Sequence, residues 1–279
     1  MNSGVRGTVG AMPRQFAKPP LVEAIVELHW ELSKASDGTL EDPRYPLFAG
    51  ALYERLNQSY PFVEKLAASE VPDKFTPHVV KLRARRGPNQ WPVYQVGPGV
   101  CTLNFTKEYH WGAFSKAAAE LHTELSEAYA GRSGGDRPRF TMAQLRYLNA
   151  FPMDREWSDS LKFLKDRLHS EFRLPESVTS LSGVRADSTH VDLAVQFRLD
   201  RPVGTGLIKF TNGTEGKRSA LIGELHVKSD PSTGDVPQDT SQFVEWLEQG
   251  HNVIETWFLE LIKGELHQSY GDIEHAANR

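Results

Sequence analysis

The stretch from residue 97 to residue 131 constrains the fold of this chain most strongly. It reads GPGVCTLNFTKEYHWGAFSKAAAELHTELSEAYAG, with a glycine-proline turn, a strand, an aromatic junction and a long amphipathic helix in unbroken order. Apolar residues recur at helical spacing after Tyr109, and Gly131 is where a left-handed helix cap is expected. A strand that leads directly into a helix of this kind predicts a layered fold with helices packed on a sheet.

Several other segments alternate apolar and polar residues with a period of two. Such alternation is typical of antiparallel strands with one face on a core and the other in water. The clearest examples are LVEAIVELHWEL (21–32), HVVKLRAR (78–85), FTMAQLRYLNAF (140–151) and HVDLAVQFRLD (190–200). The segment LIKFTNGTEGKRSALIGELHV (207–227) predicts two further strands, joined by a turn that holds Asn212-Gly213 and Gly216.

Helical spacing of apolar residues marks the remaining elements. We expect a helix over 47–60 that restarts after Pro61 as far as residue 68, and a second helix that begins near Ser158 and is stopped by Pro175. A broad aromatic stripe over 243–262 predicts the last helix, and a stripe of this kind indicates core packing.

These elements predict an α+β fold made of two pseudo-repeated strand-helix-strands-helix units, with helices on one face of antiparallel sheet and the other face open. The units span 18–131 and 140–271, and a Gly- and Arg-rich linker (132–139) joins them. Residues 1–17 are expected to be a disordered leader and 272–279 a tail. If the strands that begin at Leu21 and Phe140 pair, the two halves form one long sheet.

Composition excludes several classes of protein. The formal net charge of -4 gives no global basic field for nucleic acid, and a single cysteine, Cys101, excludes an intrachain disulfide framework. No apolar run approaches the ~20 residues of a membrane helix. We therefore expect a cytoplasmic protein that needs no membrane, and Cys101, in the middle of a predicted strand, is expected to be buried.

Four stretches together resemble an uncharacterised bacterial protein family that is distributed sporadically among genomes. They are KPPLVEAIVEL (18–28), GPGVCTLNFTKEYHWGAF (97–114), LRYLNAF (145–151) and GHNVIETWFLELI (250–262). The family has no established activity, so the resemblance supplies no catalytic residues. It implies a bacterial cytosolic protein with an accessory role in a mobile or defence-associated locus.

Polar residues on the predicted strands are the candidate binding residues. Cations recur on strand faces that could meet phosphates or an acidic partner. In each of two Glu-x-His pairs, the two side chains share a strand face. Polar aromatic residues lie where a strand ends and a helix begins. The residues are Lys81, Arg83, Arg85, Asn104, Tyr109, His110, Arg146, Arg198, Glu224 and His226. The spacings match no complete catalytic, metal-binding or phosphate-loop motif, so no catalytic residue, metal or cofactor is assigned.

Three functions remain open from the sequence. The first is a non-enzymatic protein-interaction or regulatory module, in the manner of an accessory or neutralising component of a toxin-type or defence locus. The second is nucleic-acid binding through the cationic strand faces, and the third is an enzyme or sensor that acts on a nucleotide or small ligand. A homodimer through the aromatic helices is a further alternative.

Overall fold

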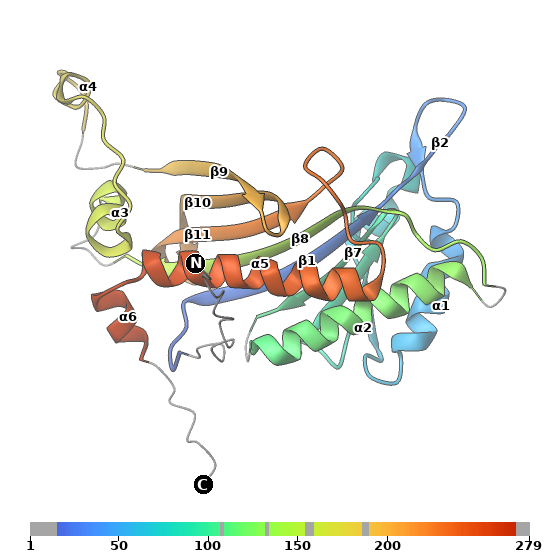
Figure 1. Cartoon of the computed structure of the whole chain (residues 1–279). Helices are drawn as coiled ribbons and strands as arrows, with labels where there is room; N and C mark the ends of the chain where they lie inside the picture. Colours follow the sequence, from blue (N-terminus) through green and yellow to red (C-terminus); the bar gives the residue numbers. More distant parts are fainter. Residues whose placement is uncertain (1–15, 107–108, 132–133, 154–158, 186–189, 272–279) are drawn as a thin grey trace, which may run out of the picture.

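A single nine-stranded antiparallel sheet forms the body of the molecule (Figure 1). The computed structural model describes residues 16–106, 109–131, 134–153, 159–185 and 190–271, so most of the predicted leader and all of the predicted tail lie outside the described residues. The strands of the sheet are β1 (Leu21–Trp30), β4 (Phe62–Lys65), β5 (Leu82–Arg85), β6 (Val93–Gly97), β7 (Val100–Phe105), β8 (Phe140–Pro152), β9 (Asp192–Asp200), β10 (Val203–Glu215) and β11 (Arg218–Ser229).

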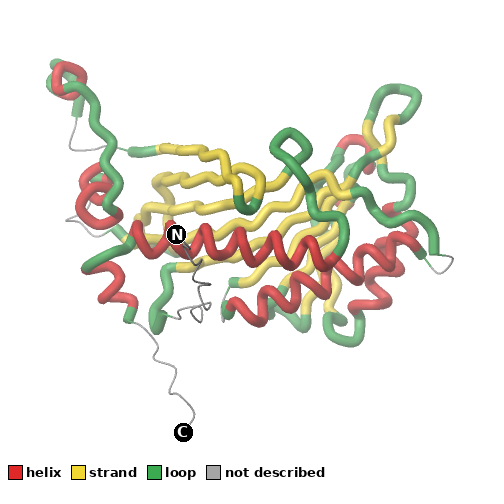
Figure 2. The backbone as a smooth tube through the Cα atoms, in the orientation of Figure 1, coloured by secondary structure: helices red, strands yellow, loops and turns green. Residues whose placement is uncertain are grey.

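Helices lie on one face of this sheet, as the α+β prediction requires (Figure 2). A small hairpin of β2 (Ser33–Lys34) and β3 (Leu40–Glu41) projects from the body. The helices are α1 (Tyr45–Leu56), α2 (Trp111–Ala130), α3 (Ser160–Leu168), α4 (Glu176–Thr179), α5 (Thr240–Leu261) and α6 (Glu265–Tyr270).

The two halves of the chain meet through β1 and β8, which pair in the centre of the sheet. Their antiparallel register runs from Leu21 opposite Asn149 to Trp30 opposite Phe140. This pairing confirms that the strands that begin at Leu21 and Phe140 join both halves into one sheet. Outward from this pair the strands are β7, β6, β5 and β4 on one side and β11, β10 and β9 on the other. An internal sequence repeat stays a prediction.

Alternation along the strands sends apolar side chains to the helix-covered face. In β1, Ala24, Val26, Leu28 and Trp30 are fully buried, and β7 and β8 add Leu103 and Leu145 to the same core. The stripes of α2 and α5 pack on these residues, led by Phe114, Leu121, Leu125, Phe243, Leu247 and Ile254. A second cluster under α3 and α6 holds Phe151, Phe163, Leu164, Leu168, Phe210, Leu221 and Ile262.

Contacts at two ends of the molecule hold the core in place. The indole N–H of Trp30 donates to a carboxylate oxygen of the buried Asp42 at 2.8 Å, which satisfies the donor of a fully enclosed tryptophan. At the other end, Phe16 contacts the rings of Phe258 and Tyr270, and the backbone N–H of Ala17 donates to Gly271. These last two residues of the predicted leader therefore join the start of the described chain to its end.

The Gly-Pro-Gly turn has a structural role, because the backbone leaves no room for a side chain at the first glycine and adopts a left-handed conformation at the second. It joins β6 to β7 in a hairpin, with Gly97 opposite Val100. A Cβ on Gly97 would lie 1.9 Å from the backbone oxygen of Val79, and Gly99 has a φ of +74°, in the left-handed region. No phosphate-binding role is needed to explain these glycines.

Four predicted boundaries are wrong. Residues 62–65 form β4, where a restarted helix was expected, because they pair with β5. The strand expected over 78–85 begins only at Leu82. The helix expected to reach Pro175 ends at Leu168, and Phe172 beyond it is exposed.

The fourth wrong boundary is the hairpin turn between β10 and β11. Asn212 and Gly213 lie within β10, and the turn is at Gly216, whose φ is +61°. Asn212 is held in the strand because its side-chain oxygen accepts from the backbone N–H of Val191 at 2.7 Å, and its amide donates to Ser160 at 2.8 Å. Asn-Gly therefore has a tertiary role here and does not form the turn.

We expect Leu145→Ala to destabilise both halves of the protein together. Leu145 is fully buried on the central strand β8, and truncation of such a leucine costs about 2–5 kcal/mol of unfolding free energy. Chemical denaturation should show one transition, shifted to lower denaturant. The control is Leu47→Ala, since Leu47 is 79% exposed and its loss should change stability by less than about 0.5 kcal/mol. Separate transitions for the two halves would contradict a shared core.

Candidate functional site

The face of the sheet opposite the helices carries a row of polar side chains that crosses both halves of the chain. The register places one row of side chains directly opposite one another across eight strands, and none of its members is apolar. From β5 to β9 the row is Arg83, Gln95, Thr102, Glu27, Gln144, Lys228, Thr205 and Arg198. We call this surface the open face.

The three predicted cations near β5 are already paired within the chain. The Lys81 ammonium is buried and lies 2.5 Å from both the carboxylate of Asp73 and the backbone oxygen of Val71. Arg85 is also buried, with its guanidinium 2.5 Å from the carboxylate of Glu64. Because a charge out of water is stable only when paired, both residues are structural ions in this arrangement.

Arg83 is the member of this group that is partly exposed on the open face. Its Nε and Nη2 both donate to the side-chain oxygen of Gln95 at 3.2 Å. The amide of Gln95 donates in turn to Asn104 and Thr102, and the amide of Asn104 donates to Glu23 at 2.8 Å. Arg83 thus begins a hydrogen-bonded chain that crosses four strands and ends on a carboxylate of β1.

Arg146, Glu224 and His226 come together on neighbouring strands. Arg146 of β8 lies directly opposite His226 of β11, and its Nη1 is 3.7 Å from the carboxylate of Glu224. The hydrogen bond with His226 at 3.4 Å, followed by the positive charge of Arg146, lowers the pKa of Glu224. Arg198 lies three strands away on β9, where it is exposed.

A second carboxylate–imidazole pair lies on β1. The His29 Nε2 and a Glu27 carboxylate oxygen are 2.6 Å apart, and the His29 ring stacks on His78 with centroids 4.5 Å apart. Burial raises the pKa of Glu27, but the hydrogen bond and charge of His29 outweigh it and the pKa is lowered. Burial lowers the pKa of His78. The two Glu–His pairs are separated by β8, so they form two clusters on the open face.

Tyr109 and His110 do not share the open face with Asn104. The Tyr109 hydroxyl lies 2.6 Å from the hydroxyl of Tyr147 on the helix-covered face. Burial raises the pKa of Tyr109. His110 is the N-cap of α2, where its Nδ1 accepts from the backbone N–H of Gly112 at 3.1 Å.

The structure adds a buried polar cluster that the sequence did not predict. The Tyr147 hydroxyl lies 2.9 Å from Nδ1 of His251 on α5, and the His251 ring stacks on Trp111 with centroids 3.7 Å apart. The Trp111 indole donates to Glu248 at 3.2 Å. Tyr147 and His251 are 104 residues apart, so no local spacing could have indicated this contact.

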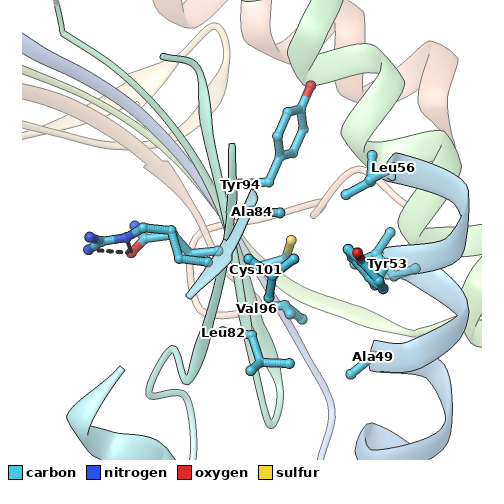
Figure 3. Close-up of a pocket in the computed structure, with 12 residues that line it drawn as sticks. Ala49, Tyr53, Leu56, Leu82, Ala84, Tyr94, Val96 and Cys101 are labelled. Atoms are coloured by element: carbon cyan, nitrogen blue, oxygen red, sulfur yellow. Dashed lines mark hydrogen bonds between the residues drawn. The ribbon is translucent and has the colours of Figure 1, made fainter. Parts of the chain in front are cut away.

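A small apolar cleft lies between α1 and strands β5 and β6 (Figure 3). It spans about 350 Å³ of space between atoms, which includes open solvent, and Tyr53, Leu56, Val96 and Cys101 are among its lining residues. Cys101 is fully buried, as predicted, and burial raises the pKa of its thiol. A thiol held protonated is a poor nucleophile, so Cys101 does not make this cleft a reactive site.

Two further observations bear on the class of protein. Among the described residues, no group of three or more His, Cys, Asp and Glu side chains is placed to hold a metal ion. In the part of the chain that the structure describes, no helix combines the length and apolar content needed to cross a bilayer.

Comparison with known proteins adds no family assignment. No protein-family model matches the chain, and no curated protein matches it at a significant level. The resemblance to a sporadic bacterial family therefore stays a prediction.

We expect two buried histidines to make the fold sensitive to acid. His122 is enclosed between Phe140 and Phe243, and burial lowers its pKa to about 4, as it does for His251. Below pH 6.5 the unfolded chain binds protons that the folded chain does not, so stability falls as the pH falls from 6.5 to 4. Each histidine contributes up to about 3 kcal/mol to this loss.

Denaturation at pH 7 and pH 4.5 measures the loss. His122→Phe should reduce it, because phenylalanine keeps the aromatic stacking and Thr240 still contacts the hydroxyl of Thr123 at 3.1 Å. His110→Asn is the control, since His110 is exposed and asparagine also caps helices. An identical pH dependence in wild type and His122→Phe would contradict the assignment.

Proposed function

We propose that this chain is a non-enzymatic protein-interaction module whose binding surface lies at the β9 end of the sheet. Eight of the sixteen exposed large apolar side chains of the described residues fall between 172 and 203. They are Phe172, Leu174, Val178, Leu181, Val184, Val195, Phe197 and Val203. Apolar side chains concentrated in this way mark interaction sites far more often than scattered ones do.

The first five of these residues belong to one projecting segment. Residues 170–185, which we call the arm, leave α3 and carry the short helix α4 away from the sheet at the end where β9 begins (Figure 1). Leu181 is 60% exposed and Val184 is 48% exposed. A segment that presents apolar side chains to water away from the core gains stability when a partner covers it.

Nucleic-acid binding has less support, because the charges that suggested it are engaged within the chain. Lys81 and Arg85 are buried against carboxylates, and Arg146 lies beside Glu224. The open face therefore carries mixed charge, whereas a phosphate-binding surface needs cations free to displace counterions.

An enzyme has less support for a geometric reason. The Glu27–His29 and Glu224–His226 pairs lie on strands that flank β8, so each carboxylate contacts its own imidazole and the two pairs do not form one constellation. An apolar projecting arm suits a regulatory or neutralising role, because such a role needs only a surface that binds another protein.

The test is quantitative co-purification from the native host with the full-length chain as bait. Leu181→Ser combined with Val184→Ser should reduce the amount of retained partner at least about tenfold, since apolar anchor residues dominate interface energies. Leu47→Ser is the matched control, because Leu47 is the most exposed apolar residue on α1 and lies at the other end of the sheet. Equal recovery with wild type and the arm variant would overturn the proposal.

A further inference from the structure

The β9 strand forms an unusually long free edge of the sheet. Among the residues that the structure describes, it is the outermost strand on its side and pairs with β10 alone, and it runs for nine residues. Seven of these nine residues are exposed, and they lie in a part of the sheet with a complete antiparallel ladder to β10. A long edge strand offers a row of backbone donors and acceptors to another strand.

The exposed side chains of this edge are apolar on the helix-covered side. Val195 is 53% exposed and Phe197 is 40% exposed, although the Phe197 ring contacts Trp257 of α5 with centroids 5.4 Å apart. A Cβ on Gly206 would lie 2.3 Å from the Trp257 ring, so the indole packs directly on β10 and leaves the outer half of β9 uncovered. One more strand beside β9 would cover this apolar strip.

We propose that the strand which covers β9 is β9 of a second copy of this chain, paired antiparallel about a two-fold axis at Val195. In this register Val195 faces its own symmetry mate and Leu193 faces Phe197 of the second copy, which places apolar side chains together on the helix-covered side. On the open face, Asp192 of each chain faces Arg198 of the other. The sequence DLAVQFR is thus self-complementary in both charge and apolar pattern.

Other registers that keep the faces aligned fit less well. With the axis at Gln196, Asp192 would face Asp200 of the second copy at both ends, and like charges directly opposite destabilise a strand pair. With the axis at Phe197, Leu193 would face Arg201 and no opposite charges would meet. Charge complementarity therefore selects the axis at Val195.

The arm fits the same arrangement. Antiparallel pairing sets the start of one β9 beside the end of the other, and the arm leads into the start of β9. It therefore lies beside the β9–β10 turn of the second copy, where Val203 is 46% exposed. The inference rests on the proposed interaction role of this end of the molecule. It names a second copy of the chain as the partner.

Charge-reversal variants of the full chain, measured singly and as a mixture, test the pairing. Wild type should show twice the 31.3 kDa chain mass by light scattering. Arg198→Asp alone and Asp192→Arg alone should each weaken dimerisation at least about tenfold, because each places like charges opposite at both ends. An equimolar mixture of the two variants should recover the dimer, since aspartates of one chain then face arginines of the other. Lys217→Asp, at the β10–β11 turn outside the β9 edge, is the control and should remain dimeric.

Cysteine scanning tests the register. Val195→Cys should form a disulfide-linked dimer under mild oxidation, because the two side chains face each other across the axis, and the native Cys101 is buried. Phe197→Cys should not form a disulfide-linked dimer, since position 197 of the second copy would lie four residues further along the strand. A wild-type monomer at every concentration, a dimer insensitive to both charge reversals, or linkage through Phe197→Cys would overturn the inference. The proposed function fails separately, if the arm variant retains every partner that wild type retains.

Discussion

The pairing of β1 with β8 is the contact on which the rest of the structure depends. Each strand comes from a different half of the chain, and each is flanked on its far side by strands of its own half. Their shared face carries Val26, Leu28 and Leu145, which are buried under α2 and α5. Because antiparallel strands in register send alternate residues to the same side, this one pairing extends both the apolar core and the polar row of the open face across the two halves.

Much of this fold is predictable from local pattern alone. Period-two alternation located β1, β8 and β9, and apolar stripes located α2 and α5, because burial on one face imposes these periods directly. The errors arise where a distant residue decides the structure. Residues 62–65 are a strand because β5 lies beside them, and Asn212 stays within β10 because Val191 and Ser160 bind its side chain. No local window contains those partners.

The candidate site was less predictable for the same reason. Alternation indicated that Arg83 and Arg146 would leave the core side of their strands, but whether they would be free or paired depends on Gln95 and Glu224, which other strands supply. Asn104 and Tyr109 are close in sequence, but Asn104 contacts Glu23 on the open face and Tyr109 contacts Tyr147 on the helix-covered face. Charge on a strand face is therefore a weak guide to charge available for binding.

The two outer edges of the sheet are unequal, and this inequality sets a limit on assembly. At one end β9 offers nine residues, whereas at the other β4 offers four, of which Glu64 is engaged with Arg85 and Lys65 is exposed. A sheet with two adhesive edges can grow into a fibre, but a sheet with one can join only a single neighbour. The proposed pairing through β9 would therefore close at two chains, because the short charged edge at β4 offers little to a further copy.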